Sequence, residues 1–383
     1  MVTTSVSASW NLPGVNGTIS SANASTSSAN FTVGIIGTIG TGVTGSVNSP
    51  VLATSPSDVA TNYGATSDIY ETYNAFYSQN QTATTYLIPV TDYTSANLTA
   101  GIAALKDIGI SLFVSPVGSQ TATLAEASIA ALDTIISPLW NYDQALYGFH
   151  ITAAVGDAPT LTTLGQSVNS AYTAVIGFPV GSPDAPTVLA GYSAAVIATK
   201  MSASPATPLQ QLSVAAQATP LIVNTFSAVE RNTLYNNGIS PTKQQSGNVT
   251  IDVCCTTYQK NAAGTADNSY QDVETMFKLS TFIPGLTSYL SSFYMGDSSK
   301  ILVDDGASIS TSGNFNVTTP NAIKASIAAY CTLSAQDFII EDVDTTNPNI
   351  AVTRNGNKVS CYVPIILSGV LRQINFDADF SLS

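Results

Sequence analysis

The middle of the chain constrains the fold most strongly, because strand-like and helix-like patterns alternate there between residues 83 and 202. Parallel strands need a long connection between them, which is usually a helix, so this alternation predicts a parallel sheet covered by helices. The strand-like runs are short and apolar and lie at residues 84–90, 108–114, 145–154 and 172–178. The helix-like patterns lie at residues 95–106, 121–136 and 185–201.

Both ends of the sequence alternate between apolar and polar residues with a period of two, which is typical of a strand with one buried face. Such a strand can pair with a sheet edge of another chain or complete the sheet of its own domain, and the pattern leaves both open. For pairing with another subunit, the predicted contact residues are Val2, Val6, Trp10 and Leu12 at one end and Ile374, Phe376, Phe380 and Leu382 at the other.

The remaining segments have weaker patterns. Residues 205–240 are rich in small and polar residues and predict a connector. A helical pattern over residues 272–293 contains Pro284-Gly285, which predicts a break there. The other expected elements are strands at residues 31–38 and 248–258, a helix at residues 320–331, and a hairpin with strands at residues 349–353 and 359–363 around an Asn-Gly turn.

Composition limits the classes of function. With 383 residues, two domains are expected. Only 9% of the residues are charged, against about 25% in typical soluble domains. Interface cores are depleted in charged residues, so extensive burial in an assembly would explain the low charged fraction. A general compositional bias of the source organism would explain it equally well. The net charge of −13, without any basic run, argues against nucleic acid and anionic membranes as partners.

The N-terminal residues have no positive region followed by an apolar one, so no signal peptide is expected. No apolar stretch approaches the roughly 20 residues needed to span a bilayer, and membrane insertion is not expected.

The sequence offers little for catalysis or metal binding. Its one histidine, His150, lies in an apolar strand pattern, and no Gly-x-Ser-x-Gly motif accompanies it, so we interpret it as a structural residue. The glycines of residues 34–40 have the wrong spacing for a dinucleotide-binding loop. Asp304-Asp305 lacks a third ligand, and the four cysteines lack metal-ligand spacing. We therefore expect no catalytic residue, cofactor or metal.

Several segments, in order along the chain, resemble motifs of the Mu-like phage tail sheath proteins. Residues 230–240 (ERNTLYNNGIS) resemble the family's ERNxLLxxGIS, and residues 204–210 (SPATPLQ) its DPARPLQ. Residues 256–275 (TTYQKNAAGTADNSYQDVET) are similar to its TTYQxNAxGxxDxSYLDVET. Shorter matches follow the same order: Leu12-Pro13-Gly14-Val15, Val303-Asp304-Asp305-Gly306, Thr318-Thr319-Pro320 and Ile323-Lys324-Ala325.

The chain departs from this pattern in places. Ser204 and Thr207 replace an Asp and an Arg of the DPARP motif, and arginines expected after the VET motif are missing near Phe282. Any charged contacts that those residues make in relatives would be apolar or hydrogen-bonded here.

The resemblance implies a two-part α/β fold. An outer, subtilisin-like α/β domain with a parallel sheet would span residues 85–240. An inner α+β domain would combine residues 21–84 with residues 241–371. Extended β-strand arms would occupy residues 1–20 and 372–383, joining the sheets of neighbouring subunits.

The resemblance also implies a mechanical function: a structural subunit that polymerises as stacked rings around a tail tube and contracts to drive the tube through a host envelope. Its partners would be further copies of itself, the tube protein, and baseplate and tail terminator proteins, in a virion assembled in the host cytoplasm. Two alternatives remain at this point: the sheath of a phage-tail-like bacteriocin or injection system, and a serine hydrolase with a subtilisin-like fold. Labelling by serine-reactive probes would distinguish the second.

Overall fold

The computed structural model describes residues 31–214, 225–245, 247–296, 300–307 and 316–379. Its helices are α1 Pro56–Tyr63, α2 Asp68–Gln79, α3 Ser95–Ala103, α4 Ala122–Ile136, α5 Ala158–Val168, α6 Pro186–Ala203, α7 Ala228–Asn236, α8 Val273–Tyr294, α9 Pro320–Gln336 and α10 Val343–Asn349, with 3-10 turns η1 Val117–Ser119 and η2 Ser137–Trp140. Its strands are β1 Thr32–Thr38, β2 Val51–Leu52, β3 Thr84–Val90, β4 Leu112–Val114, β5 Phe149–Val155, β6 Thr173–Phe178, β7 Gln210–Val214, β8 Ile239–Gln245, β9 Asn248–Val253, β10 Ile301–Leu302, β11 Val317–Thr318, β12 Ala351–Asn355 and β13 Lys358–Tyr362.

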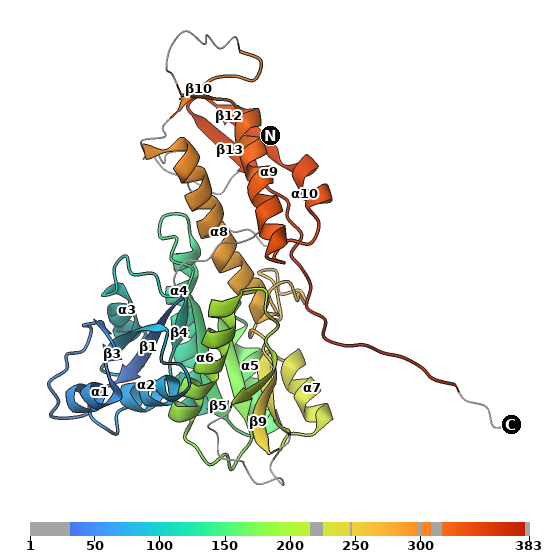
Figure 1. The fold of residues 1–383 in the computed structure, drawn as a ribbon. Coiled ribbons are helices and arrows are strands. Elements are labelled where there is room, and N and C mark those ends of the chain that lie inside the picture. Colours follow the sequence, from blue (N-terminus) through green and yellow to red (C-terminus); the bar gives the residue numbers. More distant parts are fainter. Residues whose placement is uncertain (1–30, 215–224, 246, 297–299, 308–315, 380–383) are drawn as a thin grey trace.

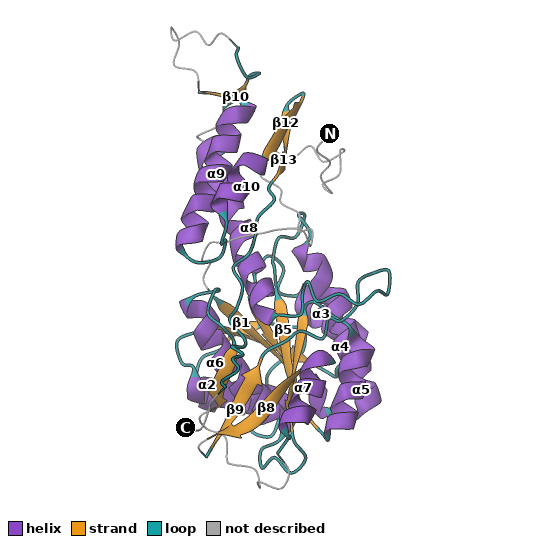
Figure 2. Ribbon diagram, turned by 90° about the vertical axis from the view of Figure 1, so that its right-hand side faces the viewer, coloured by secondary structure: helices purple, strands orange, loops and turns teal. Residues whose placement is uncertain are grey.

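The body is a nine-stranded sheet in the order β2-β3-β1-β4-β5-β6-β8-β9-β7. The six strands from β3 to β8 in this order are parallel, as the alternating pattern predicted. Antiparallel strands β2, β9 and β7 extend the two edges. Helices α2 and α6 cover one face, and α3, α4 and α5 cover the other (Figure 2).

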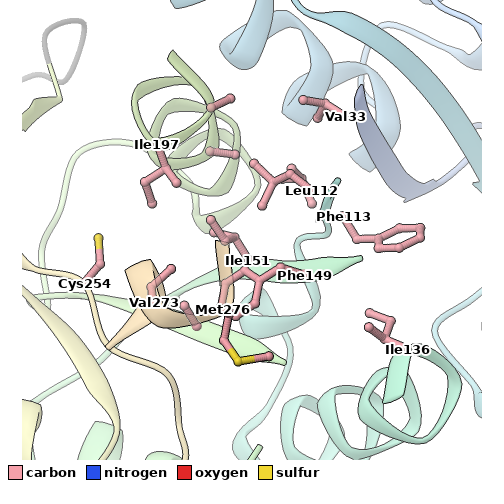
Figure 3. Close-up of a cluster of buried hydrophobic side chains, with 14 of the residues drawn as sticks. Val33, Leu112, Phe113, Ile136, Phe149, Ile151, Ile197, Cys254, Val273 and Met276 are labelled. Carbon is pink, nitrogen blue, oxygen red and sulfur yellow. The ribbon is translucent and has the colours of Figure 1, made fainter. Parts of the chain in front are cut away.

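Apolar residues on both faces of the central strands build the core. Leu112, Phe113 and Ile151 are at most 1% exposed, as expected for parallel strands covered on both sides. Figure 3 shows Ile197 of α6 and Ile136 of α4 approaching these strands from different helices, and Val273 and Met276 of α8 in the same cluster. The first turns of α8 therefore belong to the core of the body.

α8 connects this body to a second, elongated part made of the end of α8, α9, α10 and the β12–β13 hairpin (Figure 1). Its 22 residues correspond to a length of about 33 Å. The Tyr330 ring of α9 packs at a tilt against those of Phe282 and Tyr289 of α8, with ring centroids 5.1 and 5.2 Å apart. The expected hairpin is present, and Gly356 in its turn has a φ of 62°.

The predicted break at Pro284 is wrong, because α8 is continuous through this residue. A proline in a helix removes one backbone hydrogen bond and costs about 3 kcal/mol. Burial of Phe282, Ile283 and Leu290 on both sides of Pro284 offsets that cost.

The predicted connector at residues 205–240 is also wrong in part, because it contains β7 and α7. Helix α7 begins at a capping box in which the Ser227 hydroxyl accepts a hydrogen bond from the Glu230 backbone N–H and the Glu230 carboxylate accepts one from the Ser227 N–H. This Ser-x-x-Glu signal was present in the sequence.

The large sheet crosses the boundaries of the predicted domains at two places. Residues 21–84 were assigned to the inner domain, yet β1 lies between β3 and β4 in the large sheet. Residues after 240 were also assigned there, yet β8 and β9 extend the same sheet. Hydrogen bonding in the sheet therefore groups residues 32–90 and 239–253 with the outer α/β segment.

One stretch among the described residues, Ala122–Trp140, is long and apolar enough to cross a membrane when judged by length and composition alone. No apolar stretch of that length was expected from the sequence, and this one contains the charged residues Glu126 and Asp133. In the fold it is α4 followed by η2, and its side chains Ile129, Leu132 and Ile136 are completely buried in the body. A core helix of a globular layer passes the same test, so this stretch is weak support for membrane insertion.

Candidate functional site

The C-terminal segment leaves the body of the molecule as an extended chain (Figure 1). Among its predicted contact residues, Ile374 is 74% exposed and Phe376 is 85% exposed. No strand is assigned over residues 369–379, so the described part of the segment does not complete a sheet of its own subunit. Phe380 and Leu382 lie outside the described residues, as do Val2, Val6, Trp10 and Leu12.

Arg372 anchors the point from which this segment departs. Its guanidinium donates hydrogen bonds to both carboxylate oxygens of Glu274 at 3.0 and 2.9 Å, to Asp272 Oδ1 at 3.0 Å and to Gln210 Oε1 at 3.2 Å. The Glu274 carboxylate also accepts a 2.6 Å hydrogen bond from the Leu209 backbone N–H. Sequence reasoning missed this cluster.

Burial and charge oppose each other in this cluster. The Glu274 side chain is 1% exposed and that of Arg372 23%. Burial raises the pKa of Glu274, and the Arg372 charge offsets only part of this rise. Burial alone would lower the pKa of Arg372, but the two carboxylates more than offset it and raise that pKa. Removal of either partner would leave the other charge poorly solvated, which makes the pair a strong local constraint.

The second, elongated part of the molecule exposes large apolar side chains. Phe338 after α9 is 75% exposed, and Ile301 of β10 is 51% exposed. Others are Phe293, Met295, Leu333, Tyr362 and Ile366. Scattered exposed apolar residues are ordinary, but their recurrence on this small part makes it a candidate contact surface.

His150 of β5 lies between two other polar side chains, Ser115 directly after β4 and Thr173 of β6. Its Nε2 lies 2.7 Å from Ser115 Oγ and its Nδ1 lies 3.3 Å from Thr173 Oγ1. Ser115, His150 and Thr173 are all fully buried. A catalytic triad places a carboxylate where Thr173 stands and needs a serine that substrate can reach. Burial lowers the pKa of His150 to about 3, so the imidazole is neutral at physiological pH.

The crevice at which open α/β sheets usually bind ligands is filled by protein. It lies between β1 and β4, where the strand order reverses. A Cβ atom added to Gly37 would lie 2.5 Å from the backbone of Ile69, so the start of α2 packs directly on the strand. The Asp68 carboxylate accepts hydrogen bonds from Tyr93 Oη at 2.6 Å and Thr38 Oγ1 at 2.9 Å. These bonds fill the crevice at the carboxyl end of β1.

A polar hollow lies near the end of α7. It is lined by Asn236, Tyr258, Gln259, Ala266, Asp267, Asn268 and Gln271. Its polar groups are largely bonded to protein already: Tyr258 Oη donates to Asp267 at 2.8 Å, and Gln259 Nε2 donates to backbone carbonyls. Among the residues that the structure describes, no group of three His, Cys, Asp or Glu side chains is placed to hold a metal ion.

The four cysteines are free thiols in the subunit, three of them buried and Cys361 half-buried. Burial raises the pKa of Cys255 and Cys331 to about 12 and that of Cys361 to about 11, so thiolate is scarce at neutral pH.

We expect that a reductant changes neither the unfolding midpoint of the protein nor the stability of its polymers. Polymers that dissociate in reductant, but not in buffer alone, would demonstrate disulfides between subunits.

Fold and sequence point to the same class of protein. The molecule combines a parallel-rich α/β body, a smaller elongated part and an extended segment, and this is the fold of solved tail sheath proteins. A chain of the anti-feeding prophage baseplate superposes with a TM-score of 0.62 at 14% identity, over 97% of this chain and 100% of that chain. A chain of the anti-feeding prophage helical sheath in its contracted state gives 0.59 at 15% identity, over 99% of each. The sheath tail protein of Desulfitobacterium hafniense gives 0.56 at 8% identity, over 89% of this chain and 97% of that chain.

A curated relative supports the same class from sequence. The Mu-like prophage FluMu tail sheath protein of Haemophilus influenzae is 26% identical over 228 residues, which are 59% of this chain and 45% of that protein. The match therefore spans less than half the length of the relative. No family model matches the chain. The chain is thus similar to tail sheath proteins in sequence and in fold.

Proposed function

We propose that this chain is the structural subunit of a contractile tail sheath. It would polymerise as stacked rings around a tail tube and repack into a shorter, wider lattice that drives the tube through a host envelope. Its sequence similarity to a tail sheath protein and its fold similarity to sheath and baseplate chains support this proposal.

The observation that carries the proposal is the free C-terminal segment. Ile374 and Phe376 project from an extended chain that its own subunit does not cover. Exposure of large apolar side chains in water is unfavourable, and burial of each contributes roughly 1.5–3 kcal/mol. A sheet edge of a neighbouring subunit supplies both an apolar surface and backbone hydrogen-bonding groups. The segment therefore fits a role as an arm between subunits, together with residues 1–20.

The work of contraction would come from protein interfaces. A two-state repacking releases free energy when the second lattice buries more surface than the first. The low fraction of charged residues, 9%, suits subunits that bury much of their surface against each other. Further partners in this proposal are the tube, baseplate and tail terminator proteins, and the protein would be a component of a phage or phage-like particle assembled in the host cytoplasm.

Electron microscopy of the purified protein tests the proposal. We expect negatively stained samples to contain long hollow cylinders of uniform diameter, and light scattering to rise cooperatively with protein concentration. A protein that stays monomeric at every concentration, with or without tube protein present, would contradict the proposal.

A further inference from the structure

The chain before the C-terminal segment is bonded to the rest of the subunit at several successive residues, of which Arg372 is the last. Ile340 and Leu367 form an antiparallel bridge, and the Ser368 N–H donates to the Ile339 carbonyl at 3.0 Å. Lys278 Nζ donates to the Ser368 carbonyl at 2.7 Å, and Gln210 Nε2 donates to the Leu371 carbonyl at 3.0 Å. Arg372 then makes its ion pairs with Asp272 and Glu274.

Beyond Arg372, the side chains of the described residues 373–379 make no hydrogen bond or ion pair with the body. Their side-chain hydrogen bond is local: Gln373 Nε2 donates to Asn375 Oδ1 at 2.6 Å. All seven of these residues are exposed. Arg372 is therefore the last described residue of the chain that is bonded to the body, and residues 373–379 after it are exposed. Its positive charge makes the bonds at this boundary.

The groups that hold Arg372 come from distant parts of the sequence. Asp272 and Glu274 lie at the start of α8, where the N-cap residue Asp272 makes no capping hydrogen bond with its side chain. Its carboxylate is thus available to Arg372. Gln210 lies in β7 at the edge of the large sheet. Arg372 consequently fixes the segment to the junction between the sheet edge and the long helix.

We propose that Arg372 is a positioning residue that sets the place and direction in which the C-terminal segment leaves the subunit, with Asp272 and Glu274 as its anchor. This inference rests on the proposed sheath function. A segment anchored at Arg372 explores a smaller volume than one held only by the weaker, neutral bond at Leu371 and the contacts at Ser368, so its effective concentration at a neighbouring sheet edge is higher. The anchor makes assembly efficient without touching the neighbouring subunit.

Trypsin provides a direct test, because Arg372–Gln373 is itself a trypsin site next to an exposed chain. In the native protein the guanidinium is held by carboxylates, so we expect slow cleavage despite the exposure. Glu274→Gln removes the charge and keeps an acceptor for the Leu209 N–H. Since a charge-assisted hydrogen bond is about twice as strong as a neutral one and cleavage follows the population of the open form, we expect cleavage to be roughly tenfold faster. Mass spectrometry of the released peptide 373–383 gives the rate.

Two further variants make the comparison specific. Asp304→Asn removes the partner of Arg354 in an ion pair whose carboxylate is 80% exposed, and it should leave cleavage at Arg372 unchanged. Arg372→Lys keeps a trypsin site and one positive charge, but loses the forked geometry, so it should be cleaved at an intermediate rate. Equal rates in the native protein and Glu274→Gln would overturn the anchor.

Assembly is then measured on the same samples. If the anchor positions the segment, Glu274→Gln needs roughly tenfold more protein for half-maximal cylinder formation, and Arg372→Lys needs a concentration between those of the native protein and Glu274→Gln. A variant that is cleaved quickly yet assembles at the native concentration would refute positioning. Native protein that forms no cylinders, but is protected at Arg372, would refute the sheath function and reduce the anchor to a local clamp of the fold.

Discussion

Deletion of residues 373–383 is expected to leave a folded, soluble monomer with an unchanged unfolding midpoint and to abolish cylinder formation. Residues 373–379 of this segment are exposed, their side-chain hydrogen bond is local, and Phe376 is 85% exposed. Their apolar side chains are the part of the segment that a neighbouring subunit can bury. Circular dichroism melting and sedimentation on one sample separate the fold from the assembly.

The stability of the truncated protein is expected to depend on whether Arg372 is included in the deletion. Deletion of residues 372–383 also removes the partner of Glu274, whose side chain is 1% exposed. Breaking a buried pair leaves an uncompensated charge, and we expect this longer deletion to cost roughly 3 kcal/mol more than the shorter one, as measured by denaturant unfolding. The two truncations form a matched pair that differs by Arg372 alone.

Point substitutions test the role of the same segment in assembly without shortening the chain. Phe376→Asp combined with Phe380→Asp places charge on the face to be buried and should block assembly as the deletion does. Asp377→Asn combined with Asp379→Asn changes the alternate positions and should leave assembly intact. A truncated chain that still builds full-length cylinders would refute the arm, and one that unfolds would show that the segment belongs to its own domain.

The sequence predicts some parts of this fold because local pattern and tertiary structure agree there. The strands around Ile88, Phe113 and Ile151 are continuous apolar runs, as strands buried on both faces must be. The prediction failed where tertiary contacts override local signals. Pro284-Gly285 predicts a break, but packing on either side keeps α8 continuous. The place of β1 between β3 and β4 depends on contacts across 50 or more residues, which no local pattern reports.

The candidate site was predictable in part. Alternation identified Ile374 and Phe376 as a possible arm face, because a period of two is local information. The anchor depends on Arg372 meeting residues about 100 positions away, with separations of 100 and 98 to Asp272 and Glu274. One signal was available: the chain has three arginines, and each makes an ion pair in the structure. An arginine directly before an amphipathic segment was therefore worth testing as a member of an ion pair, although its partners are distant in the sequence.

Acidification should destabilise the subunit through His150, which burial keeps neutral. Its pKa is lowered to about 3 in the folded state, against the ordinary 6.5. The unfolded chain therefore binds a proton that the folded chain does not between these values, so stability is fully present above pH 6.5 and falls as the pH drops towards 3. At about 1.36 kcal/mol per pH unit, the loss between pH 6.5 and pH 4 amounts to roughly 3 kcal/mol.

His150→Gln isolates this contribution, because glutamine can bond to Ser115 and Thr173 but does not titrate. The variant loses some packing at pH 7, so its free energy of unfolding starts below that of the native protein. On acidification the carboxylates titrate equally in both, and the difference between the two should shrink by roughly 3 kcal/mol by pH 4. The native sequence and His150→Gln are both compared with residues 373–383 deleted, so that assembly does not contribute to the measured free energy of unfolding. Parallel stability curves from pH 7 to pH 4 would show that His150 is protonated in the fold, and its bonds to Ser115 and Thr173 would then need a different assignment.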